Sequence, residues 1–388
     1  MELYIHYPFC IQKCRYCDFL SAPSTADVRG AYMDALINEI CAEAANYKSE
    51  PVETIFIGGG TPSIMAAREL ERLMAALHKH FSISARAEIT MEANPGTLTK
   101  SLCTAMTNSG INRLSLGLQS ADDTQLKNLG RIHTFEQFCE SYTMAANAGI
   151  KNINVDLMSA LPGQTQASWE DTLEKVLDLG PQHISAYSLI IEEGTPFYEI
   201  YGENQNNALS APPLPDEDTE RKMYEQTKII LEGSGFNRYE ISNYALPGFE
   251  CRHNIGYWQR KDYLGLGLGA ASLIENVRFT NTGSLSKYMQ FYGNNPNAAE
   301  SCYQEIHPLT LKEQMEEYMF LGLRLTRGIQ AADFQRTFGK SMMDIYGEVI
   351  QKHYKEGLLN YIEETGQLQL TPRGIDVSNY VLSDFLID

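Results

Sequence analysis

The first half of the chain alternates between short β-rich runs and segments with helical periodicity. Strands are expected at residues 3–9, 54–60, 87–95, 113–120, 152–163 and 183–191. Between them, segments such as 28–47 and 168–180 repeat apolar residues at helical spacing. Alternation repeated this often predicts βα units and a parallel sheet. The fold class is therefore α/β, and six such units fit a partial (β/α)6 barrel.

The rest of the chain divides at a polar, proline-rich stretch, residues 203–218, which is the clearest linker candidate. We expect a core at residues 1–202, a middle region at 203–304 and a small C-terminal helical domain at 305–388. The last segment predicts three helices followed by short strands, the order of a winged-helix-like domain. Such domains can bind DNA. This one carries more acid than base, so we expect an interaction or packing role.

Charge and composition exclude several classes of partner. The 388 residues carry a formal charge of -18, so nucleic acid is not an expected partner, because its phosphates need Lys and Arg. The start of the chain has neither the basic nor the apolar region of a secretory signal, and no run of eighteen apolar residues predicts a membrane-spanning helix. We therefore expect a cytoplasmic protein whose eight cysteines are reduced thiols or metal ligands.

Three cysteines, Cys10, Cys14 and Cys17, follow the first expected strand with the spacing C-x3-C-x2-C. Three thiolates can hold three irons of a [4Fe–4S] cluster and leave the fourth iron for a ligand that is not protein. The alternative is a structural zinc ion, which takes four ligands and would need a distant fourth such as His6 or Cys251. The spacing favours the cluster.

Polar residues recur at the far ends of the later expected strands, where barrel enzymes place their chemistry. They are Glu92, Gln119, Arg131 and Asp156. An arginine there can hold a carboxylate through two hydrogen bonds, and an acid can hold a ribose diol. The glycine run "GGGTP" also ends a strand, and glycines let a backbone approach a ligand closely. Together these residues predict one polar site above the cysteine loop.

With Tyr16 just before the last cysteine, the cysteine loop resembles that of the radical S-adenosylmethionine superfamily. The stretches "YIHYPFC", "GGGTP", "EANPG", "LGLQS", "LGRIH" and "DLMSALPGQT" resemble the family of oxygen-independent coproporphyrinogen oxidases and their relatives over nearly the whole chain. The resemblance implies that S-adenosylmethionine supplies the missing iron ligand. Its implied protein contacts are Tyr4, Tyr16, Gly59, Gly60, Thr61, Glu92, Gln119, Arg131, Asp156 and Ile190.

The chain departs from the oxidases in two places. They carry one more cysteine two residues after the triad, where this chain has Phe19. They also have a long extension before the first strand, whereas only three residues precede Tyr4 here. Both differences argue against decarboxylation of coproporphyrinogen.

A second motif, H-N-x-x-Y-W, resembles the signature of HemW-type haem chaperones. Its residues, His253, Asn254, Tyr257 and Trp258, are implied haem contacts. An imidazole is a common axial ligand of haem iron, and Tyr and Trp offer broad apolar faces to a porphyrin. The glycine run that follows lacks a βαβ context, so it does not predict a dinucleotide site.

The resemblance implies a chaperone that binds a [4Fe–4S] cluster, S-adenosylmethionine and haem, and passes haem to acceptor proteins. It further implies acceptors among membrane respiratory components, peripheral contact with the membrane, a homodimer, and an electron donor such as flavodoxin or ferredoxin. One alternative is a coproporphyrinogen III oxidase that forms protoporphyrinogen IX through a 5′-deoxyadenosyl radical. The other is a zinc-stabilised binding protein without redox chemistry.

Overall fold

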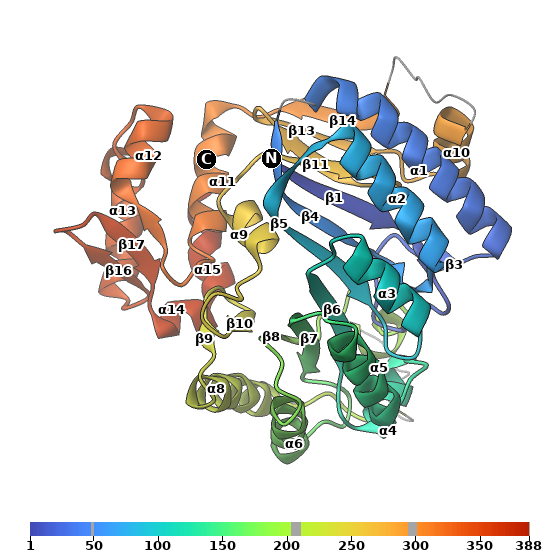
Figure 1. Cartoon of the computed structure of the whole chain (residues 1–388). Coiled ribbons are helices and arrows are strands. Elements are labelled where there is room, and N and C mark those ends of the chain that lie inside the picture. The colour runs from blue at the N-terminus through green and yellow to red at the C-terminus, as the bar shows by residue number, and fades with distance from the viewer. Residues whose placement is uncertain (48–49, 203–210, 294–300, 388) are drawn as a thin grey trace.

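The structure is a computed structural model that describes residues 1–47, 50–202, 211–293 and 301–387 (Figure 1). The six expected strands form and pair in parallel, in chain order across the sheet. They are β1 (Glu2–Tyr7), β4 (Pro51–Gly59), β5 (Ser82–Ala93), β6 (Arg113–Gln119), β7 (Asn152–Ser159) and β8 (His183–Ser188). The predicted partial barrel is confirmed.

Helices between these strands cover the outer face of the sheet (Figure 1). They are α1 (Ala26–Tyr47), α2 (Ala67–His80), α3 (Lys100–Asn108), α4 (Asp123–Leu129), α5 (Phe135–Asn147) and α6 (Gln166–Leu177). Because side chains alternate along a strand, Leu3 and Ile5 of β1 join the apolar core under the helices. Tyr4 and His6, which hydrogen-bond to each other, take the opposite face inside the barrel.

Residues after the sixth strand extend the sheet at both edges, to twelve strands among the described residues. Beyond β1 the sheet continues, in this order, with β11 (Tyr263–Leu266), β12 (Ala271–Ile274), β13 (Val277–Asn281) and β14 (Tyr303–Pro308). Beyond β8 it continues with β10 (Asn243–Ala245) and then β9 (Asn237–Arg238). Residues from the predicted core and the predicted middle region therefore share one sheet. The domain boundaries themselves stay predictions.

Short elements and connecting helices complete this part of the chain. They are β2 (Phe9–Cys10), β3 (Ala22–Pro23), the 3-10 turn η1 (Pro62–Ile64), α7 (Tyr198–Tyr201), α8 (Glu217–Gly233), α9 (Arg252–Trp258) and α10 (Leu285–Gly293). Strands β2 and β3 pair in parallel and so hold the two ends of the cysteine loop together. Of the predicted linker, residues 203–210 lie outside the described residues and 217–218 begin α8.

The C-terminal segment forms helices around a small sheet with an apolar core of its own. Its elements are α11 (Leu311–Gly322), β15 (Ile329–Gln330), α12 (Ala331–Phe338), α13 (Met342–Lys355), β16 (Leu359–Ile362), β17 (Gln367–Leu370), α14 (Pro372–Asp376) and α15 (Ser378–Ser383). The expected three helices and following strands are present, and the two-residue strand β15 adds a third strand beside β17.

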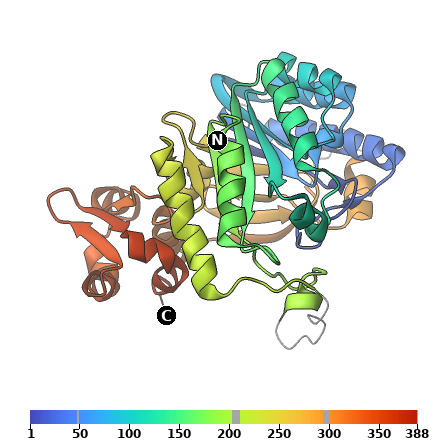
Figure 2. The same cartoon turned by 90° about the horizontal axis from the view of Figure 1, so that it is seen from below.

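Both views place this C-terminal domain on the side of the molecule away from α1 and α2 (Figures 1 and 2). Helix α9 lies between the sheet and α11, and contacts both β4 and α11 (Figure 1). None of the helices in the described ranges has the length and apolar character needed to cross a bilayer.

Candidate functional site

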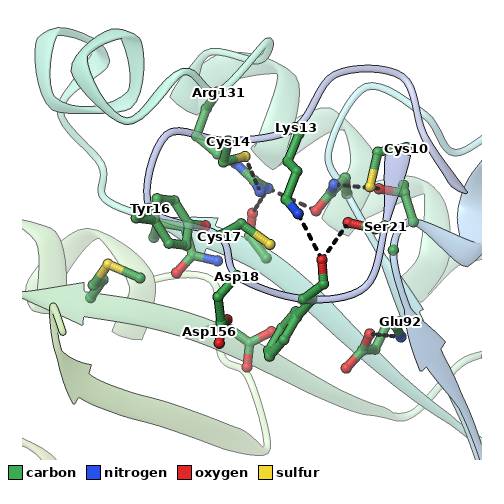
Figure 3. A pocket seen from close by; sticks show the side chains of 18 of the residues that line it. Cys10, Lys13, Cys14, Tyr16, Cys17, Asp18, Ser21, Glu92, Arg131 and Asp156 are labelled. Atoms are coloured by element: carbon green, nitrogen blue, oxygen red, sulfur yellow. Dashed lines mark hydrogen bonds between the residues drawn. The ribbon is translucent and has the colours of Figure 1, made fainter. Parts of the chain in front are cut away.

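A cavity of about 410 Å³ lies at the carboxyl ends of the parallel strands, under the cysteine loop (Figure 3). Cys10, Cys14 and Cys17 all line it. So do nine of the ten predicted S-adenosylmethionine contacts: Tyr16, Gly59, Gly60, Thr61, Glu92, Gln119, Arg131, Asp156 and Ile190. The fold therefore brings together residues that span more than 180 positions of sequence.

Hydrogen bonds fix the shape of the cysteine loop. The Lys13 ammonium crosses the loop and donates to the carbonyl oxygen of Phe19 at 2.8 Å (Figure 3). The Arg15 N–H donates to a residue outside the loop, the carbonyl oxygen of Leu129, at 3.0 Å. The loop is thus closed on itself and tied to the end of α4.

Two of the three cysteine sulfurs accept hydrogen bonds from predicted site residues. The Thr61 hydroxyl donates to Cys10 Sγ at 3.3 Å, and the Arg131 guanidinium donates to Cys14 Sγ at 3.6 Å. Burial raises the pKa of the third thiol, Cys17. Donors aimed at sulfur stabilise negative charge there, and such bonds tune iron–sulfur clusters. The donor set therefore fits a cluster held by three thiolates.

Neither candidate fourth protein ligand is free to complete a zinc site. His6 Nε2 donates to the carbonyl oxygen of Leu20 at 2.9 Å, and Nδ1 accepts from the Tyr4 hydroxyl at 2.9 Å. Cys251 lies at the other end of the barrel, 3.6 Å from the carboxylate of Glu88. Among the described residues, no three His, Cys, Asp or Glu side chains gather closely enough to hold a single metal ion.

The glycine run brings backbone close to the cysteine loop. Gly59 has φ +110°, and a Cβ there would lie 2.5 Å from the imidazole of His6. A Cβ on Gly60 would lie 2.7 Å from the carbonyl oxygen of Phe9. The Gly59 N–H donates to the Glu92 carboxylate at 3.0 Å. Only glycine fits these two positions, which explains the run.

Two acids face the cavity from β5 and β7, the two strands that flank β6. Burial, and then the negative charge of Asp156, raise the pKa of Glu92 to about 7. Burial also raises the pKa of Asp156, which accepts hydrogen bonds from Ser115 at 3.1 Å and Asn154 at 2.7 Å. The two carboxyl groups can accept hydrogen bonds from the amine or hydroxyl groups of a polar ligand.

Asn94 is a site residue that the sequence analysis missed. Its amide nitrogen donates to the Thr61 hydroxyl at 2.9 Å, and its oxygen accepts from Arg131 at 2.8 Å. It thereby positions both side chains that contact the cysteine sulfurs. Its place in "EANPG", two residues beyond Glu92, was the available signal, because alternate residues of a strand share a face.

Tyr4 is the predicted S-adenosylmethionine contact that does not line this cavity. It lines a second cavity of about 600 Å³, together with Tyr257 and Trp258 of α9. The structure thus places Tyr4 beside the predicted haem residues. Its contact with S-adenosylmethionine stays a prediction.

The other two predicted haem residues line neither of these two cavities. His253 is 1% exposed, and its ring nitrogens lie 2.7 Å from the Thr54 hydroxyl and 3.0 Å from the Tyr257 hydroxyl. Burial, and then the charge of Arg113, lower the pKa of His253 to about 3, so the ring is neutral. A neutral imidazole can bind iron, but an iron would have to replace one of these two hydrogen bonds. Asn254 is partly exposed on the same helix.

Helix α9 is held in the barrel by an acid at its N-terminus. The Glu88 carboxylate accepts from the N–H groups of Arg252 and His253 at 3.1 and 3.2 Å. A carboxylate there accepts hydrogen bonds from the N–H groups that have no partner within the helix, and its negative charge interacts favourably with the positive end of the helix dipole. This contact ties the start of α9 to β5.

Comparisons with known proteins agree with this geometry. Residues 4–176 match the family described as the radical SAM superfamily, and residues 309–377 match the HemN C-terminal domain. The chain is 37% identical to "Heme chaperone HemW" of Lactococcus lactis, over 99% of this chain and 97% of that protein. It is 35% identical to "Heme chaperone HemW" of Bacillus subtilis, over 99% and 98%.

A mitochondrial protein of Bos taurus, "Radical S-adenosyl methionine domain-containing protein 1", is 31% identical over 97% of this chain and 83% of its own length. Among solved structures, coproporphyrinogen III oxidase (HemN) of Escherichia coli superposes with a TM-score of 0.84. That match covers 99% of this chain and 89% of the oxidase at 23% identity, so it shows a shared fold and no more.

Proposed function

The chain belongs to the HemW family of haem chaperones, and we propose that it binds haem at α9 and passes it to acceptor proteins. The observation that carries this proposal is the second cavity, where Tyr257 and Trp258 meet other aromatic side chains. Apolar aromatic faces of this kind suit a flat porphyrin ring. His253, Asn254, Tyr257 and Trp258 are the proposed haem contacts, with His253 as the iron ligand after it releases Thr54 or Tyr257.

We place a [4Fe–4S] cluster and S-adenosylmethionine in the cysteine cavity. Cys10, Cys14 and Cys17 would hold the cluster, which when bound and reduced supplies the electron for cleaving S-adenosylmethionine. The chain's own residues orient the ligand. Glu92 and Asp156 accept its hydrogen bonds, while the Gly59–Thr61 backbone closes one wall.

Residue 19 favours the chaperone over the oxidase. Phe19 lines the cysteine cavity and is 62% exposed. Its apolar ring occupies the position at which the related oxidases carry a further cysteine. This chain therefore has no thiol at that position to take part in a reaction. The acceptor proteins, contact with the membrane, the electron donor and the homodimer stay predictions from the family resemblance.

The test compares haem binding and oxidase activity in one preparation. Protein with a reconstituted cluster would be titrated anaerobically with haem. In parallel it would receive S-adenosylmethionine, a reductant and coproporphyrinogen III, and protoporphyrinogen IX would be assayed. We expect a haem absorption band without porphyrinogen conversion. Conversion at a rate typical of enzymes would reject the chaperone assignment in favour of the oxidase.

A further inference from the structure

The second cavity is built jointly by the barrel and the C-terminal domain. Tyr4 and Tyr263 line it from the sheet, Tyr257 lines it from α9, and Phe320 and Leu321 line it from α11. Its lining is mainly apolar and aromatic. The only charged side chains among its described lining residues are Arg278 of β13 and Glu317 of α11.

These two charged residues are bound to each other at the edge of the cavity. Arg278 donates to one oxygen of the Glu317 carboxylate at 2.7 Å, and Arg260 donates to the other oxygen at 2.9 Å. The Arg278 side chain is 36% exposed, whereas those of Glu317 and Arg260 are 12% and 7% exposed. Arg278 is therefore the guanidinium that a ligand can reach.

We propose that Arg278 binds a carboxylate of a flat, apolar ligand in this cavity, and that Glu317 competes with that carboxylate for Arg278. The inference rests on the proposed haem-binding function, because haem combines a flat apolar ring with two propionates. Guanidinium groups bind carboxylates through paired hydrogen bonds, so a propionate can take the place of the Glu317 carboxylate as the hydrogen-bond acceptor for Arg278.

The second arginine makes this exchange feasible. When Arg278 turns to the ligand, Glu317 keeps its hydrogen bond to Arg260, so no buried charge is left unpaired. The exchange breaks one contact between the barrel and α11. The C-terminal domain therefore forms one wall of the ligand site, and ligand binding weakens the attachment of that wall to the barrel.

The test measures the affinity of the full-length protein for haem and for haem dimethyl ester, whose propionates are capped. Wild-type protein should bind haem about tenfold more tightly than the ester. Arg278→Gln should lose that preference and bind both ligands equally. Glu317→Gln should bind haem several-fold more tightly than wild type. Arg72→Gln, which removes an exposed ion pair between α2 and Asp34 of α1, is the matched control and should behave as wild type.

The two variants separate ligand recognition from a structural effect. Both remove the ion pair between Arg278 and Glu317, and Glu317→Gln also removes the pair with Arg260, so a role limited to holding the C-terminal domain predicts that both weaken haem binding. That result, or an unchanged preference for haem over its ester in Arg278→Gln, would overturn the inference. If wild-type protein bound neither ligand, the proposed haem-binding function itself would fail.

Discussion

The imidazole of His253 stacks on the ring of Phe56, with 5.2 Å between ring centroids and 26° between ring planes. Phe56 in turn stacks on Tyr4, at 6.4 Å and 28°. The Tyr4 hydroxyl donates to His6, whose other ring nitrogen donates to Leu20 at the end of the cysteine loop. A row of rings inside the barrel thus joins the haem motif to the cysteine loop.

Replacing His253 by alanine should weaken haem binding and leave the cluster intact. The change removes the proposed iron ligand, so haem affinity should fall at least about tenfold. It also removes a buried ring and two hydrogen bonds, which should lower the free energy of unfolding by about 3 kcal/mol. Haem titration, iron and sulfide analysis and thermal unfolding measure the three effects.

His307→Ala is the matched control, because His307 is an exposed histidine whose side chain is 55% accessible. It should keep wild-type haem affinity and stability to within about 0.5 kcal/mol. If His253→Ala binds haem as tightly as this control does, His253 is not part of the haem site.

Replacing Cys14 by alanine should abolish the cluster. A cluster held by three thiolates has no spare protein ligand, so loss of one sulfur leaves a second iron without a protein ligand. Reconstituted protein should lose its iron, its sulfide and its brown absorbance. Cys139→Ala, on α5 and away from the loop, should keep all three. Full iron and sulfide content in the Cys14 variant would disprove the assignment of the triad.

Glu2 should make stability depend on pH. Burial raises the pKa of Glu2 from its ordinary 4.5 to about 8, so the folded protein holds a proton that the unfolded chain releases at neutral pH. The contribution of this group to stability is therefore greatest below about pH 4.5 and falls as pH rises toward about 8.

Glu2→Gln removes that titration and keeps the shape of the side chain. The free energy of unfolding of the variant, relative to wild type, should rise by about 3 kcal/mol between pH 5 and pH 8. Denaturant unfolding of both proteins at several pH values measures this difference. The titration of other buried acids is the same in both proteins and cancels from the difference. A difference that does not change with pH would show that Glu2 titrates normally.

Gly256 should accept a side chain only at a cost in stability. It lies in α9 between the predicted haem residues, and a Cβ there would lie 1.8 Å from the carboxylate of Glu2. Gly256→Ala must displace the buried carboxylate of Glu2, so the free energy of unfolding should fall by about 1–3 kcal/mol, and haem binding should weaken. Thermal unfolding and haem titration measure both effects.

Gly347→Ala is the control for this helical glycine. It lies inside α13, where the nearest atom to an added Cβ is 3.8 Å away. Alanine there should stabilise the protein by about 0.5–1 kcal/mol because it favours the helix. Equal effects of the two substitutions would mean that the contact between Gly256 and Glu2 does not constrain α9.

The sequence by itself determined the parallel strands, the cysteine loop and the cavity at the strand ends. Those features depend on local patterns: strand–helix alternation, three cysteines at fixed spacing and polar residues where strands end. Parallel strands bring their carboxyl ends to one edge, so Glu92 and Asp156 had to lie near each other once the strands formed. Periodicity and spacing carry that information without tertiary contacts.

Only the tertiary structure decided how the remaining residues meet. Strand β11 pairs with β1 across more than 250 residues of sequence, and no local pattern specifies that pairing. The pairing helps place Tyr4 beside Tyr257 in the second cavity, and α11 adds Glu317 opposite Arg278. Contacts between distant segments depend on the shape and burial of the whole fold, so the charged edge of that cavity could not be read from the sequence.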